Sequence, residues 1–201
     1  MIVGIDFSIN STAVVIKLPK GSLYLSFVPN YNPKLKGFKT HEELIKPLIV
    51  SSYNKNSVSS SSVEEQSMKL KNADELSDLI ITTIKLFEIQ PSEIRIEGFS
   101  FGSKGNSFID LITYNTFLKV KLIKEYGHII KVVPPKTLKK LYTGNGNASK
   151  CDMLRTYMEQ GDCRLQQKIK ALGIVKYDEE FTIPKPIDDI IDAIALTEVE
   201  I

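Results

Sequence analysis

The sequence contains no tryptophan, two cysteines, two histidines and no long apolar run among its 201 residues. A membrane-spanning helix needs about 20 consecutive apolar residues, so we expect no membrane partner. Cys151 and Cys163 are too few for a disulfide framework, and their spacing does not suit a zinc site. His41 and His128 each stand alone, which favours surface or packing roles over metal coordination. Because the chain opens on an apolar, strand-like run without a basic leader, we expect a cytoplasmic protein whose reduced cysteines serve packing.

The length and composition are those of one globular domain. With 42% hydrophobic and 25% charged residues, the chain can bury a substantial core, and we expect a single domain over residues 1–201. Its net charge is only +2, but lysines dominate residues 103–150 and acidic residues dominate residues 174–201. This asymmetry is either surface patterning or the mark of an enzyme that acts on a polyanion, with lysines on phosphates and carboxylates at a metal site.

Apolar periodicity predicts an α/β sheet. Short runs rich in β-branched residues predict five strands, and the first three follow one another closely enough to pair antiparallel. Longer stretches with helical spacing predict the helices between and after the later strands. The predicted strands lie near residues 1–6, 12–18, 23–28, 94–98 and 129–133, and the predicted helices near 62–90, 107–127, 149–161 and 187–198. This order indicates a mixed sheet with helices packed on its faces.

Two segments have an irregular pattern. Residues 29–62 contain several prolines and end in a serine-rich run, which predicts an insertion in the domain that closes with a linker. The lysines and aromatic residues of this insertion leave two interpretations open, a solvated loop and an arm that touches DNA. Residues 139–150 are basic and contain two glycines, which predicts a loop, and Ser149 with Asp152 predicts the start of the next helix.

The apolar run Ile2-Val3-Gly4-Ile5 leads directly into Asp6. A carboxylate at the end of a buried strand is poorly hydrated, so it needs a hydrogen-bond partner, a proton or a metal ion. Asp6 either caps the turn that follows or belongs to a functional site, and this stretch alone does not decide between the two.

Further carboxylates favour the functional interpretation. Glu97 also ends a predicted strand, and functional groups of α/β sheets collect at strand ends. Asp189 and Asp192 are three residues apart on one face of the last helix, where Asp192 stands between isoleucine and alanine. Hard oxygen ligands without histidine or cysteine favour Mg²⁺ or Mn²⁺, and two such ions about 4 Å apart suit phosphodiester hydrolysis. For Asp188 and Asp189, capping of the helix start is the alternative role.

These pieces together resemble the RuvC-type Holliday-junction resolvases of the ribonuclease H-like superfamily. The matching motifs occur in family order and, outside residues 29–62, at nearly family spacing, so that the resemblance covers about four-fifths of the chain. The long insertion suggests a phage or other viral branch, which would place the protein in the host cytoplasm. The motifs are Gly4-Ile5-Asp6-Phe7-Ser8, Ile94-Arg95-Ile96-Glu97, the stretch Pro135-Lys136 to Lys139 with Gly144, Gly146, Ala148 and Lys150, and Asp189-x-x-Asp192-Ala193-Ile194-Ala195.

The resemblance implies a fold, an activity and a set of site residues. The fold would be a ribonuclease H-like mixed sheet of five strands, three antiparallel and then two parallel, flanked by helices. The activity would be that of a homodimeric endonuclease that cuts Holliday junctions and other branched DNA in recombination and repair. The implied metal ligands are Asp6, Glu97, Asp189 and Asp192, holding two Mg²⁺ or Mn²⁺ ions, with Lys150 as a further catalytic residue and Lys104, Lys136, Lys139, Lys140, Phe99 and Phe101 as DNA contacts.

Three alternatives remain open at this point. A related nuclease that cleaves RNA–DNA hybrids would use similar carboxylates. An ATPase of the actin or sugar-kinase type also opens on Gly-Ile-Asp, but such proteins are usually much longer and carry a later glycine-rich adenosine site, which the sequence lacks. A DNA-binding scaffold with an inactive site is the third, and the presence of every matching acid argues against it.

Overall fold

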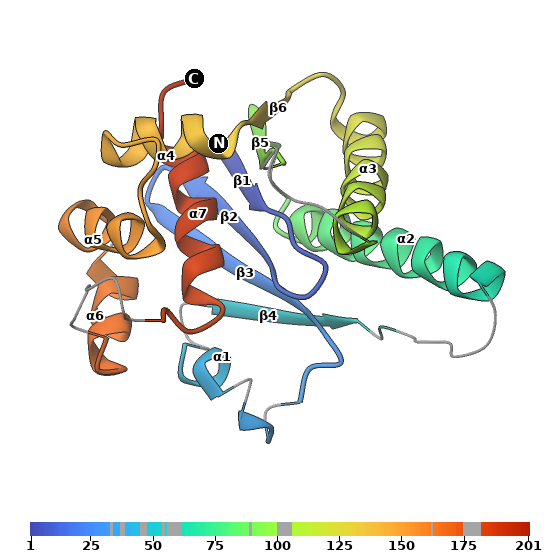
Figure 1. The fold of residues 1–201 in the computed structure, drawn as a ribbon. Helices are drawn as coiled ribbons and strands as arrows, with labels where there is room; N and C mark the ends of the chain where they lie inside the picture. Colours follow the sequence, from blue (N-terminus) through green and yellow to red (C-terminus); the bar gives the residue numbers. More distant parts are fainter. Residues whose placement is uncertain are drawn as a thin grey trace.

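The structure is a computed structural model, and it describes residues 1–32, 34–36, 39–44, 48–53, 55, 62–88, 90–99, 106–161, 163–174 and 182–201. Within these ranges one mixed six-stranded sheet carries helices on both faces, as Figure 1 shows. The expected α/β architecture, a mixed sheet flanked by helices, is therefore confirmed. No helix in the described ranges is long and apolar enough to cross a membrane.

The sheet has the strand order β4-β3-β2-β1-β5-β6. Its first three strands pair antiparallel, and its last two run parallel to β1, as the sequence predicts. The bounds are β1 Ile2–Asp6, β2 Thr12–Leu18, β3 Gly21–Pro29, β4 Leu48–Tyr53, β5 Glu93–Glu97 and β6 Ile130–Val133.

The expected count of five strands was wrong, because β4 lies inside the predicted insertion and pairs parallel with β3. Leu48 and Tyr53 at its two ends are buried, whereas the middle of the strand, with Ser51 and Ser52, is partly or fully exposed. A strand at the edge of a sheet can carry exposed serines. The serines of β4 therefore make this segment resemble a linker. The extended conformation of β4 is decided by its pairing with β3, which is not adjacent to it in the sequence.

Both faces of the sheet are covered, and β2 shows why. Ala13 and Val15 face one hydrophobic cluster, whereas Val14 and Ile16 face the other. This central strand is therefore apolar on both faces of the sheet. Helices α2 and α3 cover one face, and α7 crosses the other with α4, α5 and α6 outside it (Figure 1). The helices are α1 Lys39–Glu43, α2 Ser62–Leu86, α3 Asn106–Tyr126, α4 Pro135–Thr143, α5 Lys150–Gln160, α6 Cys163–Ala171 and α7 Ile187–Glu198.

All four predicted helices are present, and the described residues contain three that were not predicted, α1, α4 and α6. The basic segment 139–150 is only partly a loop, because α4 extends to Thr143 before Gly144 ends it in the left-handed conformation. Helix α6 was not predicted. Its first residue, Cys163, is exposed, so the predicted packing role holds only for the buried Cys151. The capping box of Ser149 at the start of α5 is confirmed.

Candidate active site

Strand pairing brings Asp6 and Glu97 side by side. In the parallel pair of β1 and β5, Ile5 is the register partner of Ile96, so the next residue on each strand ends it at the same edge of the sheet. Ile5 and Ile96 point into the core beneath α2 and α3. Because side chains alternate along a strand, Asp6 and Glu97 project to the opposite face, where α7 lies.

Helix α7 packs directly on β1 because Gly4 has no side chain. A Cβ atom at this position would lie 2.2 Å from the carbonyl oxygen of Ala193. Buried Arg95 fixes the C-terminal end of the helix by donating to the carbonyl oxygens of Leu196, at 2.8 Å, and Val199, at 2.6 Å. A helix held in this way presents its N-terminal half to the strand ends that carry Asp6.

The four predicted carboxylates line a single cleft of about 390 Å³. Asp6 comes from β1, Glu97 from β5, and Asp189 and Asp192 from one face of α7. The residues of this cleft that the sequence singled out are Asp6, Glu97, Asp189, Asp192, Lys139, Lys150 and Phe99. Residues far apart in the chain thus meet at one place.

Burial and mutual repulsion raise the pKa values of these carboxylates. Burial raises the pKa of Asp6 well above its ordinary value, and the charges of Glu97 and Asp192 add to this shift. Burial likewise raises the pKa of Asp192 to about 7, again with Glu97 adding and Lys150 opposing. The pKa of Glu97 is raised by burial, against a hydrogen bond with Asp6 and the charges of Lys139 and Lys150. A cluster of buried acidic side chains favours the binding of a cation.

The cleft suits a hard divalent cation in the chemistry of its donors. Oxygen ligands are what Mg²⁺ and Mn²⁺ prefer, and neither histidine nor cysteine is among the lining residues. As they stand, no three acidic, histidine or cysteine side chains in the described ranges are gathered closely enough to hold an ion. Asp189 accounts for part of this, because its Oδ2 accepts a hydrogen bond from the Ser11 hydroxyl at 2.5 Å and its Oδ1 binds the Lys185 ammonium.

Asp188 has a different place from Asp189. It does not line the cleft, and its buried Oδ2 binds the ammonium groups of Lys150 and Lys185, the latter at 3.1 Å. The N-cap of α7 is Pro186 and has no side-chain cap, so the capping role considered for these two acids is not observed. Asp189 is therefore the member of the pair that faces the other carboxylates.

The predicted DNA-contacting lysines divide into two groups. Lys139 and Lys150 line the cleft, and the Lys139 ammonium donates to the carbonyl oxygen of Ala148 at 2.7 Å. Lys136 and Lys140 lie exposed on α4 outside the lining. Lys104, together with Phe101, lies outside the described residues.

Phe99 forms part of the cleft wall. Its ring packs edge to face on Phe108 at a centroid distance of 5.8 Å, and the Lys119 ammonium lies 5.1 Å from its centroid. Next to this wall, Asn115 of α3 reaches the cleft with a buried amide oxygen that has no hydrogen-bond partner within the part of the chain that the structure describes. Sequence reasoning missed Asn115, since nothing in a helical stripe marks an inward-facing amide.

Residues of the predicted insertion form hydrogen bonds to the β1–β2 loop, which lies beside the cleft. The Tyr53 hydroxyl at the end of β4 donates to the carbonyl oxygen of Ile9 at 2.6 Å, and the Lys55 ammonium donates to Asn10 Oδ1 at 2.8 Å. Ile9 and Asn10 belong to the β1–β2 loop, which also carries Ser11, the donor to Asp189. Tyr53 is buried, which removes it from the residues that an arm could offer to DNA. Phe38, another aromatic residue of the insertion, lies outside the described residues.

The raised pKa of Asp192 predicts a pH dependence of stability without metal. The folded pKa of about 7 lies above the ordinary value of 3.8, so the native state holds the proton more tightly than the unfolded chain. Stability is then highest below the unfolded pKa and falls as pH rises toward 7. We expect the melting temperature in chelator to drop between pH 5 and pH 8, and Asp192→Asn to flatten this profile. Parallel profiles for the two proteins would contradict the assignment.

With the geometry in place, comparisons with known proteins identify the fold. No protein-family model matches the sequence, and a search of curated proteins returned no relative. Among solved structures, the yeast mitochondrial Holliday junction resolvase Ydc2 aligns over 97% of this chain and 75% of that chain, with a TM-score of 0.52 and 13% identity. The chain therefore has the ribonuclease H-like fold of the RuvC-type resolvases, as the sequence motifs predict.

Two bacterial structures are also similar to this chain. The RuvC structure from Thermus thermophilus aligns over 97% of this chain and 89% of that chain, with 16% identity and a TM-score of 0.49. The structure of T. thermophilus RuvC in complex with Holliday junction substrate aligns over 97% and 88%, with 14% identity and a TM-score of 0.43.

Proposed function

We propose that the chain is a metal-dependent endonuclease that resolves four-way DNA junctions. The observation that carries this proposal is the convergence of Asp6, Glu97, Asp189 and Asp192 in one cleft with Lys139 and Lys150. Clustered carboxylates beside ammonium groups are what phosphodiester hydrolysis needs, because the acids hold cations and the lysines face phosphate. The yeast structural neighbour is itself a Holliday junction resolvase, which agrees with this assignment.

The four carboxylates would hold one or two Mg²⁺ or Mn²⁺ ions. Such ions activate water and stabilise the leaving oxygen of a phosphodiester. Asp6 and Glu97 sit on paired strands and give the site a rigid floor, whereas Asp189 and Asp192 close it from α7. Lys150, anchored on Asp188, stands where its ammonium can oppose the charge that develops on the phosphate.

The DNA would cross the cleft beside α4. Lys136 and Lys140 are exposed on this helix, which supports a role for them in binding the DNA backbone. Phe99, in the cleft wall, offers an aromatic face to an unstacked base at the junction centre. Lys104 and Phe101 remain predicted contacts of the same loop.

Paired cutting requires two sites, and α3 offers a surface on which two chains can meet. Its outward face carries Ile109, Ile112, Val120 and Ile123, whose exposed fractions lie between 38% and 60%. Their spacing of three, eight and three residues places them on one side of the helix. An apolar stripe of this length is unusual on a free surface, and a second copy of α3 is its natural partner in a two-fold dimer.

Interrupting this stripe with charge should separate the dimer. We expect the double variant Ile112→Lys, Val120→Lys to sediment as a monomer at concentrations where the unchanged protein is a dimer, because four lysines would face one another across the axis. Leu86→Lys is the matched control, since Leu86 is an exposed leucine at the end of α2. A dimer that survives both changes would show that the contact lies elsewhere.

The decisive experiment incubates the protein with synthetic four-way junctions in Mg²⁺ or Mn²⁺ and maps the nicks on each strand. Symmetric nicks on two opposing strands, absent in chelator, are the expected result. A linear duplex and an RNA–DNA hybrid of the same sequence serve as comparison substrates. Preferential hydrolysis of the hybrid, or thermal stabilisation by ATP without any cleavage, would reject junction resolution in favour of one of the other two activities.

A further inference from the structure

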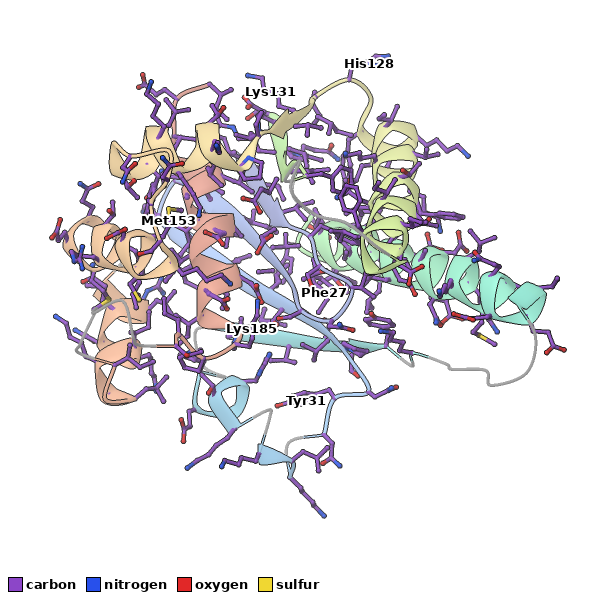
Figure 2. The ribbon with its side chains drawn as sticks, viewed as in Figure 1. Phe27, Tyr31, His128, Lys131, Met153 and Lys185 are labelled. Carbon is purple, nitrogen blue, oxygen red and sulfur yellow. The ribbon has the colours of Figure 1, made fainter. Side chains whose placement is uncertain are left out.

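Lys185 is a cleft-side cation to which the sequence motifs give no role. It lies directly before α7, where Figure 2 labels it, and its side chain is 48% exposed. Its ammonium contacts Asp188 Oδ2 at 3.1 Å and also binds Asp189 Oδ1. One lysine thus bridges two neighbouring acids, of which only Asp189 lines the cleft.

The position of this lysine has a specific electrostatic cause. The N-terminal end of a helix carries partial positive charge, so a cation next to it is unfavourable unless anions compensate it. Here the compensation comes from Asp188 and Asp189, whose side chains are only 4% and 5% exposed. Lys185 is the ammonium that contacts Asp189, whereas Asp188 also binds Lys150. Lys185 is held at the cleft by these two carboxylates.

Asp189 is also one of the four residues proposed to hold a divalent ion, so its oxygens are subject to competition. Ser11 occupies Oδ2 and Lys185 occupies Oδ1. A divalent ion bound through Oδ1 competes with the ammonium for this oxygen, because two positive charges in contact with one carboxylate repel each other. Lys185 can leave Asp189 and still contact an acid, since Asp188 Oδ2 is already 3.1 Å away and the buried Asp188 Oδ1 has no hydrogen-bond partner among the described residues.

We propose that Lys185 is a displaceable internal cation that occupies Asp189 until a divalent ion binds, and that Asp188 then retains it. This inference rests on the proposed metal site and adds a regulation of that site. The lysine lowers the apparent affinity for the ion by the free energy of the contact that must be broken. A phosphate arriving in the cleft also attracts the ammonium, so nucleic acid and ion should each bind more tightly in the presence of the other.

The proposal is tested by titrating the purified, metal-free protein with Mn²⁺ in a calorimeter. We expect Lys185→Met to tighten Mn²⁺ binding on the order of tenfold, because a positive charge next to the ion is removed. Lys185→Arg keeps the charge and should bind Mn²⁺ at least as weakly as the unchanged protein. Lys20→Met removes one exposed lysine in the β2–β3 turn, at the opposite end of the sheet, and should leave the affinity unchanged.

A double-mutant cycle shows whether the effect passes through Asp189. In an Asp189→Asn background, Lys185→Met should no longer tighten Mn²⁺ binding, since the contested oxygen has lost its charge. Thermal unfolding gives a second readout. The Lys185→Met protein should melt lower than the unchanged protein in chelator and gain more from added Mn²⁺. Equal or weaker Mn²⁺ binding by Lys185→Met would overturn the proposal and leave Lys185 as an ion pair that stabilises the start of α7.

These measurements are independent of the nuclease assay. If the unchanged protein cuts junctions and Lys185→Met does not tighten Mn²⁺ binding, the proposal that Lys185 is displaceable is wrong and the proposed function stands. If Lys185→Met tightens Mn²⁺ binding while no protein cuts a junction, the metal site and the displaceable cation stand and the proposed activity fails.

Discussion

Asp6→Asn is expected to abolish junction cleavage in Mg²⁺, with a loss of about three orders of magnitude or more, while junction binding is retained. The physical reason is that Asp6 lies among Glu97, Asp189 and Asp192 and is proposed as a ligand common to the bound ions. The lysines proposed to contact DNA are unchanged by the substitution, so binding to the phosphates should persist. Single-turnover cleavage and a gel-shift titration in Ca²⁺ measure the two properties separately.

The same substitution should raise stability in chelator. The pKa of Asp6 is raised by burial and by neighbouring acids, which means that its charged form is unfavourable in the fold. A neutral amide of the same shape removes that cost, so the melting temperature at pH 8 should rise. Asp78→Asn, the same chemical change at a 63% exposed position on α2, is the control and should alter neither property. Retained nicking by the Asp6→Asn protein would remove the central assignment.

Gly4→Ala is expected to have the largest effect on the fold. The added Cβ would lie 2.2 Å from the Ala193 carbonyl oxygen, 2.9 Å from Thr197 Cγ2 and 3.0 Å from Leu196 Cβ. A backbone atom cannot rotate away, so α7 must lift from β1, which should cost about 3 kcal/mol or more in the free energy of unfolding. Because Asp189 and Asp192 move with α7, the proposed metal site should be disrupted together with the core.

Gly98→Ala is the matched control. There the nearest atoms, Val132 Cγ1 and the Val133 carbonyl oxygen, lie 3.3 Å from the added Cβ, so a shift of a few tenths of an ångström suffices. Urea unfolding of both variants, with Mn²⁺ titration of whichever remains folded, measures the difference. If Gly4→Ala were as stable as Gly98→Ala, α7 would not be packed against β1 as described.

Much of the site follows from local sequence, because its ligands occupy positions that short-range rules describe well. Apolar runs that end in an acid predicted the strands of Asp6 and Glu97, and the 3.6-residue repeat placed Asp189 and Asp192 on one helix face. The capping box of Ser149 predicted the start of α5 and hence the position of Lys150. Each of these signals lies within a few residues of the side chain that it concerns.

Other features were decided only by the tertiary structure. The serine-containing β4 is a strand because β3 pairs with it. Its apolar start, Leu48-Ile49-Val50, is too short to predict a strand by itself, and Ser51 and Ser52 already belong to the serine-rich run. The choice between Asp188 and Asp189 depends on which side of α7 faces β1, and this is set by Gly4 and by Arg95, about 100 residues earlier in the chain. The sequence by itself determined which acids this protein has at its strand and helix ends. Long-range packing determined which oxygens face the cleft and that Ser11, far away in the chain, donates to one of them, because such contacts depend on distances that no local pattern contains.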